Sequence, residues 1–303
     1  MKIKLLLLAL LCSGVTQGQI FRSVELNDVP GSRNEDCKLV GASADGRTLL
    51  LTTDTNQGLW RMDTATGERE QITDVMGAGY QPVMSNDGEH VLYRKSEFDA
   101  SHRRVTSLHL QSLDDKKVEC VVAPTRNMQG YRFVERTAMA VADNQSVRKR
   151  IAGKRVGEDI PVVSVRDLQL MITRNGKTIQ LSPNGTDVSY IWPSLSPYGK
   201  RILYYVSEEG AYVCNLDGGD VQFISHDCRA PQWYDDHTIV GMMDVDNGEQ
   251  VTASCLFAYS LDGKCQRLTP SSSMTMYPQC CAAQSRIYCC TYQGELKQIS
   301  VEK

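Results

Sequence analysis

Histidine and cysteine side chains are the residues of this sequence that could bind a metal ion. The chain has five histidines and eleven cysteines. His226 is the best placed of the histidines, because it immediately precedes a predicted strand. A structural or catalytic metal needs at least three protein ligands around one point, and no motif brings two more to His226. We therefore predict no metal site and no other cofactor. We interpret all the histidines as strand-edge or loop residues: His90, His102, His109, His226 and His237.

Two pairs of cysteines flank a predicted turn centred on Ser285. In that arrangement Cys280 is expected opposite Cys290, and Cys281 opposite Cys289. Adjacent residues of a strand point to opposite faces, so four thiolates cannot easily converge on one ion, and the pairs lack Cys-x-x-Cys spacing. We interpret the four side chains as small buried apolar residues. One cross-strand disulfide and a metal site are the alternatives.

Covalent hydrolysis would require a nucleophilic serine on a Gly-x-Ser-x-Gly turn. Nothing in the chain matches, since segment 41–46 has the wrong glycine spacing. Segment 244–248 resembles the start of a calcium loop, but no acidic residue follows at its twelfth position, so we interpret it as a polar turn. The sequence therefore predicts a protein that is not an enzyme.

The elements that would position functional side chains are short strands that recur in a fixed order. Segment 192–225 contains four runs of strand-forming residues separated by turn signals. Such a meander cannot bury its apolar face alone, which predicts further copies along the chain. We place them at 37–73, 80–122, 128–182, 190–226, 229–270 and 277–303.

Six copies of four strands predict an all-β fold, a six-bladed β-propeller of four-stranded antiparallel blades in a single domain, 19–303. The last copy has three strands. We expect strand 20–27 to complete it, because ring closure protects strand edges. The third copy, 128–182, is degenerate and carries a basic segment, 148–155. We interpret it as one blade with a solvated insertion, and binding of an acidic partner is the alternative.

Similar residues recur at one turn and at one strand end of these copies. Ser-x-Asp-Gly occurs at 43–46 and 85–88, Ser-Pro-Tyr-Gly at 196–199, and a closing Ile-Thr or Leu-Thr at 72–73 and 268–269. Together they resemble the WD40-like repeat of the TolB-like propeller family, over most of the chain after residue 37. The resemblance does not extend to the α/β domain that precedes the propeller in TolB. It implies a binding or scaffolding module of the bacterial cell envelope. A propeller enzyme of the polysaccharide lyase kind, with a metal at the channel mouth, is the alternative.

Aromatic and polar residues recur just before the first strand of several copies. In a propeller these positions surround one mouth of the central channel, and loops on a rigid scaffold commonly carry function. We predict that some of them anchor a ligand, while packing between blades is the alternative. The candidates are Tyr80, Gln81, Tyr190, Trp192, His226, Arg229 and Tyr277.

The N-terminal residues predict export. Two lysines precede an apolar run, 5–11, that is too short to span a bilayer, and small residues precede Gln19. We expect a signal peptide at 1–18 and a periplasmic protein; lipid anchoring at Cys12 and an extracellular location are the alternatives. No second apolar run predicts a transmembrane span, and the net charge of −3 does not suggest a nucleic acid partner. We expect a monomer whose partner is an envelope protein, a peptide or a glycan.

Overall fold

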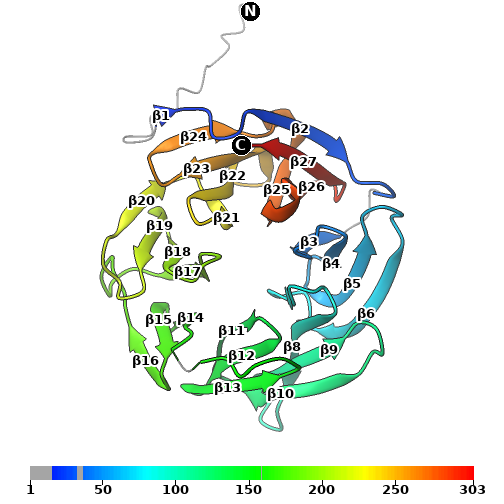
Figure 1. Cartoon of the computed structure of the whole chain (residues 1–303), viewed down its shortest axis with the longest axis vertical. Helices are drawn as coiled ribbons and strands as arrows, with labels where there is room; N and C mark the ends of the chain where they lie inside the picture. The colour runs from blue at the N-terminus through cyan, green and yellow to red at the C-terminus, as the bar shows by residue number, and fades with distance from the viewer. Residues whose placement is uncertain (1–15, 33–36, 158) are drawn as a thin grey trace, which may run out of the picture.

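Seven β-sheets surround a central axis in the computed structural model of the chain (Figure 1). The structure describes residues 16–32, 37–157 and 159–303, so the predicted signal peptide lies almost entirely outside the described residues. Strands and two short 3-10 helices, η1 (Ser271–Ser273) and η2 (Ala282–Gln284), make up the regular structure of the described part. Among these residues, no helix combines the length and apolar character that a membrane span requires. The all-β propeller is confirmed, but the prediction of six blades is wrong, because the ring has seven.

Blades 1, 2 and 5 each take four strands from one continuous segment. Blade 1 contains β3 (Lys38–Ala42), β4 (Thr48–Thr52), β5 (Gln57–Asp63) and β6 (Arg69–Met76). Blade 2 contains β7 (Val83–Met84), β8 (His90–Phe98), β9 (Arg104–Ser112) and β10 (Val118–Thr125). Blade 5 contains β17 (Tyr190–Leu195), β18 (Arg201–Val206), β19 (Gly210–Asn215) and β20 (Gln222–Ser225).

The extra blade comes from region 128–182, which forms two three-stranded blades instead of the one predicted. The basic segment predicted as a loop begins within the outermost strand of blade 3, where Lys149 pairs with Glu119 of blade 2. Blade 3 contains β11 (Met128–Val134), β12 (Thr137–Ala142) and β13 (Gln145–Arg150). Blade 4 contains β14 (Val162–Arg166), β15 (Gln169–Arg174) and β16 (Lys177–Gln180).

Strand β14 runs in the opposite direction to its neighbour β11. Near the end of β11, Arg132 Nη1 donates a hydrogen bond of 3.5 Å to the carbonyl oxygen of Pro161, just before β14 begins. At the end of β14, Arg166 donates a hydrogen bond to the Asn144 side chain, which lies beside the start of β11. After three antiparallel strands, the chain emerges on the face of the ring opposite to the face where the blade began. A second three-stranded blade returns the chain to the first face. The two short blades therefore let β17 begin on the same face as β3.

The N-terminal strand closes the ring, as the sequence predicts. Strand β2 (Ser23–Asp28) pairs antiparallel with β27 without a register shift, from Ser23 opposite Glu302 to Asp28 opposite Lys297. Blade 7 is thus built from both ends of the described chain (Figure 1). Its other strands are β25 (Thr275–Cys281), β26 (Arg286–Thr291) and β27 (Leu296–Glu302). Blade 6 contains β21 (Arg229–Asp235), β22 (Thr238–Asp246), β23 (Val251–Ser260), β24 (Lys264–Arg267) and a short parallel strand, β1 (Thr16–Gln17).

The apolar core lies between adjacent blades. Val240 and Leu256 of blade 6 pack with Ile287 and Ile299 of blade 7, and all four are fully buried. Complete burial of such a side chain stabilises the fold by roughly 1.5–3 kcal/mol. These contacts join different blades, so each blade depends on its neighbour to bury its apolar face.

The cysteine pairs belong to this core, but in a different register from the one predicted. Cys280 lies opposite Ile287, and Cys290 lies opposite Met276, because helix η2 moves the centre of the turn toward the N-terminus. Cys289 faces blade 6 and Cys290 faces blade 1, so neighbouring cysteines do point to opposite faces. The following eight cysteines are free thiols: Cys120, Cys214, Cys228, Cys255, Cys280, Cys281, Cys289 and Cys290.

The recurring Ser-x-Asp turn is a structural element. Ser43 Oγ donates a hydrogen bond of 2.6 Å to Asp45 and accepts one of 2.9 Å from the backbone N–H of Thr48. Ser85 makes the equivalent bonds to Asp87 and His90. Each serine thus fixes the connection between the first and second strands of its blade.

Candidate ligand-binding site at the channel mouth

The innermost strands of all blades except blade 4 begin on one face of the ring, which we call the mouth face (Figure 1). On this face the residue before a proline has a positive φ in four blades: Gln81 (53°), Trp192 (52°), Ala230 (45°) and Tyr277 (54°). This conformation is unfavourable for any residue with a side chain. In β17, β21 and β25 it coincides with a β-bulge, and bulges redirect side chains. In these three strands the bulge therefore changes the direction in which side chains at the mouth point.

Trp192 lies beside a second aromatic residue, Tyr205 at the end of β18. Their ring centroids are 5.4 Å apart and the rings are tilted by 59°. The Tyr205 hydroxyl donates a hydrogen bond of 3.3 Å to the backbone oxygen of His226, which joins blade 5 to the loop before blade 6. Burial raises the pKa of Tyr205, so it remains a neutral hydrogen-bonding group at physiological pH.

Arg229 and Asp244 form an ion pair beside these rings. Arg229 Nη1 lies 2.9 Å from Asp244 Oδ2; the Arg229 side chain is 47% exposed, whereas that of Asp244 is only 6% exposed. The second carboxylate oxygen, Oδ1, is buried and has no hydrogen-bond partner among the described residues. A buried carboxylate oxygen without a partner is energetically unfavourable. Because this oxygen is buried, a donor supplied by a ligand could relieve that cost only after the side chains that cover it move aside.

Tyr277 extends the site into blade 7. Lys38 of blade 1 places its ammonium group 4.8 Å from the centre of the Tyr277 ring, a cation–π contact. Burial raises the pKa of Tyr277, and the charges of Asp244 and Asp54 act in the same direction. We call the following set, which spans four blades, the mouth cluster: Lys38, Trp192, Tyr205, Arg229, Asp244 and Tyr277.

Tyr80 and Gln81 lie in a separate arrangement on the mouth face. The Arg94 guanidinium lies between the rings of Tyr80 and Tyr131, 5.0 and 5.1 Å from their centres. The Tyr131 hydroxyl lies 2.8 Å from the backbone oxygen of Gln81 and 3.1 Å from that of Tyr80. These contacts join blades 2 and 3 and place Tyr80 and Gln81 outside the mouth cluster.

Tyr190 and His226 also have structural contacts. Tyr190 is fully buried, and its hydroxyl donates to the backbone oxygen of Gly185 at 2.9 Å. His226 Nδ1 lies 2.5 Å from the backbone oxygen of Glu209, and its ring packs on Phe223. Of the seven predicted site residues, the structure thus brings Trp192, Arg229 and Tyr277 into the mouth cluster, with His226 at its edge.

One group of described side chains has metal-ligand geometry, and it lies elsewhere. The ligand atoms of Asp87, Glu89 and His90 all lie within 4.8 Å of one another, at the turn after β7 on the opposite face. Arg136 already binds both carboxylates, at 3.4 Å from Asp87 and 2.7 Å from Glu89. This guanidinium occupies the position of a cation, so we assign the group to the interface of blades 2 and 3.

Sequence reasoning missed three members of the mouth cluster. Tyr205 and Asp244 lie near the ends of second strands, and only the pairing with the first strand brings them to the mouth. Segment 244–248, which the sequence analysis interpreted as a polar turn, instead begins with the last three residues of strand β22, which ends at Asp246. An acidic residue at the end of an apolar run was the available signal for Asp244. Nothing in the sequence pairs Lys38 with Tyr277.

No family model and no curated protein matches the chain. Several solved structures share its fold. TolB from Acinetobacter baumannii is 17% identical, with a TM-score of 0.50 over 75% of this chain and 52% of its own, so this chain spans about half its length. An oligogalacturonate lyase from Vibrio parahaemolyticus is 11% identical (TM-score 0.58, 94% and 98% covered). The Cps50 (Swd1) β-propeller domain from Myceliophteria thermophila is 10% identical (TM-score 0.59, 91% and 100% covered). At these identities the likeness concerns the fold alone: the chain is a β-propeller.

Proposed function

We propose that this protein is an exported, non-catalytic binding module of the bacterial cell envelope, and that its mouth cluster holds a segment of a partner protein. The observation that carries the proposal is Asp244, a nearly buried carboxylate whose free oxygen lies beside an exposed arginine and aromatic rings. Such a group provides one specific polar contact inside an apolar surround, as anchor pockets at protein interfaces do.

The chemistry of the mouth cluster favours binding over catalysis. Acyl or glycosyl transfer needs a nucleophile or a pair of carboxyl groups with separated pKa values. The mouth cluster contains two cations, one carboxylate and three aromatic rings, and it has no thiol or aliphatic hydroxyl. Two thiols beside the mouth cluster, those of Cys228 and Cys290, are buried, and burial raises the pKa of both, so they are poor nucleophiles.

Export and an envelope location rest on the basic and apolar N-terminal residues, and the TolB-like turn motifs add support. Fractionation of cells that produce the full chain tests this part. The mature protein is expected in the periplasmic fraction with Gln19 at its N-terminus. An unprocessed chain in the cytoplasm would contradict it.

The binding role is tested by affinity capture from an envelope extract of the source bacterium. We compare the wild type with Trp192→Ala and Arg229→Ala. The matched control is Tyr198→Ala, which removes an exposed tyrosine from a turn on the opposite face. A partner captured by the wild type and the control, but lost with both mouth variants, supports the proposal. Identical capture by all four proteins would refute a role of the mouth cluster.

A metal-dependent lyase is the second candidate, favoured by the fold shared with an oligogalacturonate lyase. It requires further ligands to move toward His226, whose Nδ1 is engaged by the Glu209 backbone oxygen. Elemental analysis of the purified protein separates the two functions. One equivalent of Mn, Ca or Zn that His226→Ala removes would support the lyase.

A further inference from the structure

Blade 3 lacks the fourth strand that blades 1, 2 and 5 have on the outside of the ring. Strand β13 is therefore its outermost strand, and no described strand pairs with the outer edge of β13 (Figure 1). Ile151, which follows β13, donates its N–H to the Arg136 carbonyl oxygen at 2.9 Å. Because β13 pairs with β12 without a register shift, the N–H and C=O groups of Ser146, Arg148 and Arg150 point outward. These groups form an edge to which a further strand can be added.

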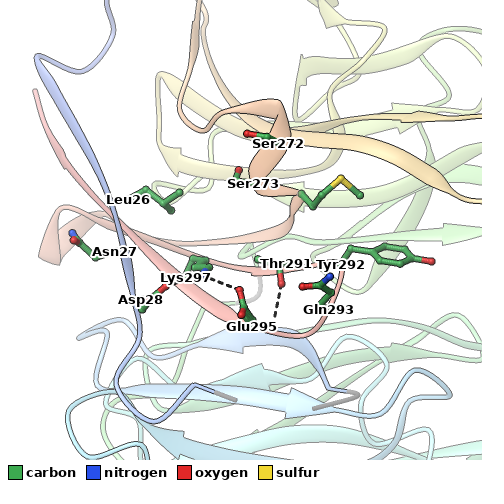
Figure 2. A pocket seen from close by; sticks show the side chains of 11 residues that line it. Leu26, Asn27, Asp28, Ser272, Ser273, Thr291, Tyr292, Gln293, Glu295 and Lys297 are labelled. Atoms are coloured by element: carbon green, nitrogen blue, oxygen red, sulfur yellow. Dashed lines mark hydrogen bonds and ion pairs between the residues drawn. The ribbon is translucent and has the colours of Figure 1, made fainter. Parts of the chain in front are cut away.

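Blade 7 shows how this protein holds a strand that is added at an outer edge. There β2 comes from the other end of the chain and pairs with β27. Asp28 of β2 lies directly opposite Lys297 of β27, and Asp28 Oδ1 lies 2.6 Å from Lys297 Nζ (Figure 2). An acidic side chain of the added strand thus pairs with a basic side chain of the edge strand.

The side chains of β13 and of the segment that follows it are basic. Five lysine or arginine residues and no acidic residue occur between positions 145 and 157. Arg150 and Lys154 have exposed side chains, and neither makes an ion pair within the described residues. Lys149 pairs with Glu119 of blade 2, so a carboxylate from another blade already binds beside this edge. The edge of β13 therefore offers the same chemistry to an added strand as β27 does.

The positive charge is confined to one sector of the ring. Segment 126–181, which forms blades 3 and 4, has eleven lysine and arginine residues and five acidic residues. Its net charge is +6, whereas that of the rest of the chain is −9. A second copy of the chain would present another basic edge, and like charges on facing strands are destabilising. Charge complementarity therefore selects an acidic segment of a different protein over a second copy.

We propose that the outer edge of β13 binds an acidic, extended segment of a partner protein, which becomes the fourth strand of blade 3. Backbone groups of the segment bond to the outward N–H and C=O groups of β13. An acidic side chain opposite Arg150 pairs with it, as Asp28 pairs with Lys297. The edge lies on the circumference of the ring, so this inference is independent of the mouth cluster.

The test is fluorescence anisotropy of a labelled eight-residue peptide in which glutamate and valine alternate. The purified full-length protein is added up to about 0.3 mM, which detects a Kd of about 0.1 mM. In one control peptide glutamine replaces every glutamate, and in the other proline replaces the two central valines. The acidic peptide is expected to bind. Both controls are expected to bind at least about tenfold more weakly, because the first lacks the charge and the second cannot pair as a strand.

Two variants locate the site on β13. Arg150→Glu should weaken binding of the acidic peptide about fivefold, because it replaces an opposite charge by a like charge. Ser146→Pro removes an outward N–H, changes no charge and breaks no bond to β12, and it should weaken binding about tenfold. The control Lys200→Glu makes the same charge change at an exposed turn of blade 5, and it should bind like the wild type.

Three outcomes would overturn the proposal. The first is that the acidic peptide does not bind to the wild type. The second is that the proline peptide binds as tightly, which would indicate attraction between charges without a strand. The third is that Arg150→Glu and Ser146→Pro bind like the wild type, which would place the peptide elsewhere. If no peptide binds, but vesicles of phosphatidylglycerol bind the wild type and not Arg150→Glu, the edge faces an anionic membrane instead. An unfolding curve for each variant verifies that it folds.

Discussion

Asp244 accepts a hydrogen bond from Arg229 through one carboxylate oxygen, while its other oxygen is buried and has no partner in the part of the chain that the structure describes. The carboxylate therefore depends on a single, half-exposed guanidinium for its stabilisation. We predict that Arg229→Ala lowers the free energy of unfolding by about 1–3 kcal/mol, because it leaves a buried charge unpaired. Asp244→Asn should lower the free energy of unfolding by a smaller amount. Urea unfolding of both single variants and the double variant measures the coupling.

The control for this pair is Arg47→Ala. Arg47 lies 3.7 Å from Asp45, and both side chains are largely exposed, so the change should be within about 0.5 kcal/mol. If Arg229→Ala is as mild as Arg47→Ala, the Asp244 carboxylate does not need its arginine, and the argument for a ligand donor at Oδ1 fails.

Phe21 anchors the segment that leads into the closing strand. It is fully buried, and its ring packs edge-on against Tyr234 of blade 6 with centroids 5.0 Å apart. We predict that Phe21→Ala destabilises the whole ring by about 3–5 kcal/mol, since it weakens closure and leaves a cavity in the core. Phe98→Ala, at a side chain that is 64% exposed, should be nearly neutral. Equal unfolding midpoints for the two variants would mean that the ring is stable without the N-terminal anchor.

Buried thiols should make the fold less stable at alkaline pH. Burial raises the pKa of Cys214 and Cys281 from 9.0 to about 12, and that of Cys290 to about 11. Above pH 9 the unfolded chain loses these protons while the folded chain retains them, so the free energy of unfolding falls with increasing pH up to the folded pKa values. Urea unfolding between about pH 8 and pH 11 measures this slope.

Cys214→Ala should reduce that slope, because it removes one of the buried thiols. In the native protein at neutral pH, a thiol reagent should modify Cys120 and leave the fully buried thiols of Cys214, Cys228 and Cys289 unmodified. Rapid modification of these three thiols would contradict the packing described for them.

The repeat pattern predicted much of the fold because each turn has a local cause. The Ser-x-Asp-Gly turn at Ser43 depends on bonds within five residues, so it is visible in the sequence. The closing strand was predictable because the last copy lacked one strand. The number of blades was not predictable. Two three-stranded blades occupy about the length expected for one four-stranded blade with an insertion, and the direction of a strand has no signature in the local sequence.

The candidate site was predictable only in part, for a related reason. Trp192 and Tyr277 were found because both precede a proline at the start of an inner strand. Lys38 reaches the same place from blade 1, through a contact with a residue far away in the chain. Asp244 reaches it through its ion pair with Arg229 on the neighbouring strand of blade 6. Tyr190 lies two residues before Trp192 and was predicted with it, yet Tyr190 is buried.

The contact between the two short blades gives the sharpest test of the seven-bladed ring. A Cβ atom added at Gly130 in β11 would lie 2.5 Å from the Val163 carbonyl oxygen and 3.0 Å from Ser164 Cβ in β14. Backbone atoms cannot move away easily, so Gly130→Ala should destabilise the protein by roughly 1–3 kcal/mol. Gly219→Ala is the matched control, because its nearest neighbour is the side chain of Asp217 at 3.2 Å. Urea unfolding measures both variants. If Gly130→Ala were as stable as Gly219→Ala, β11 and β14 would not be in contact, and the division of region 128–182 into two adjacent blades would be wrong.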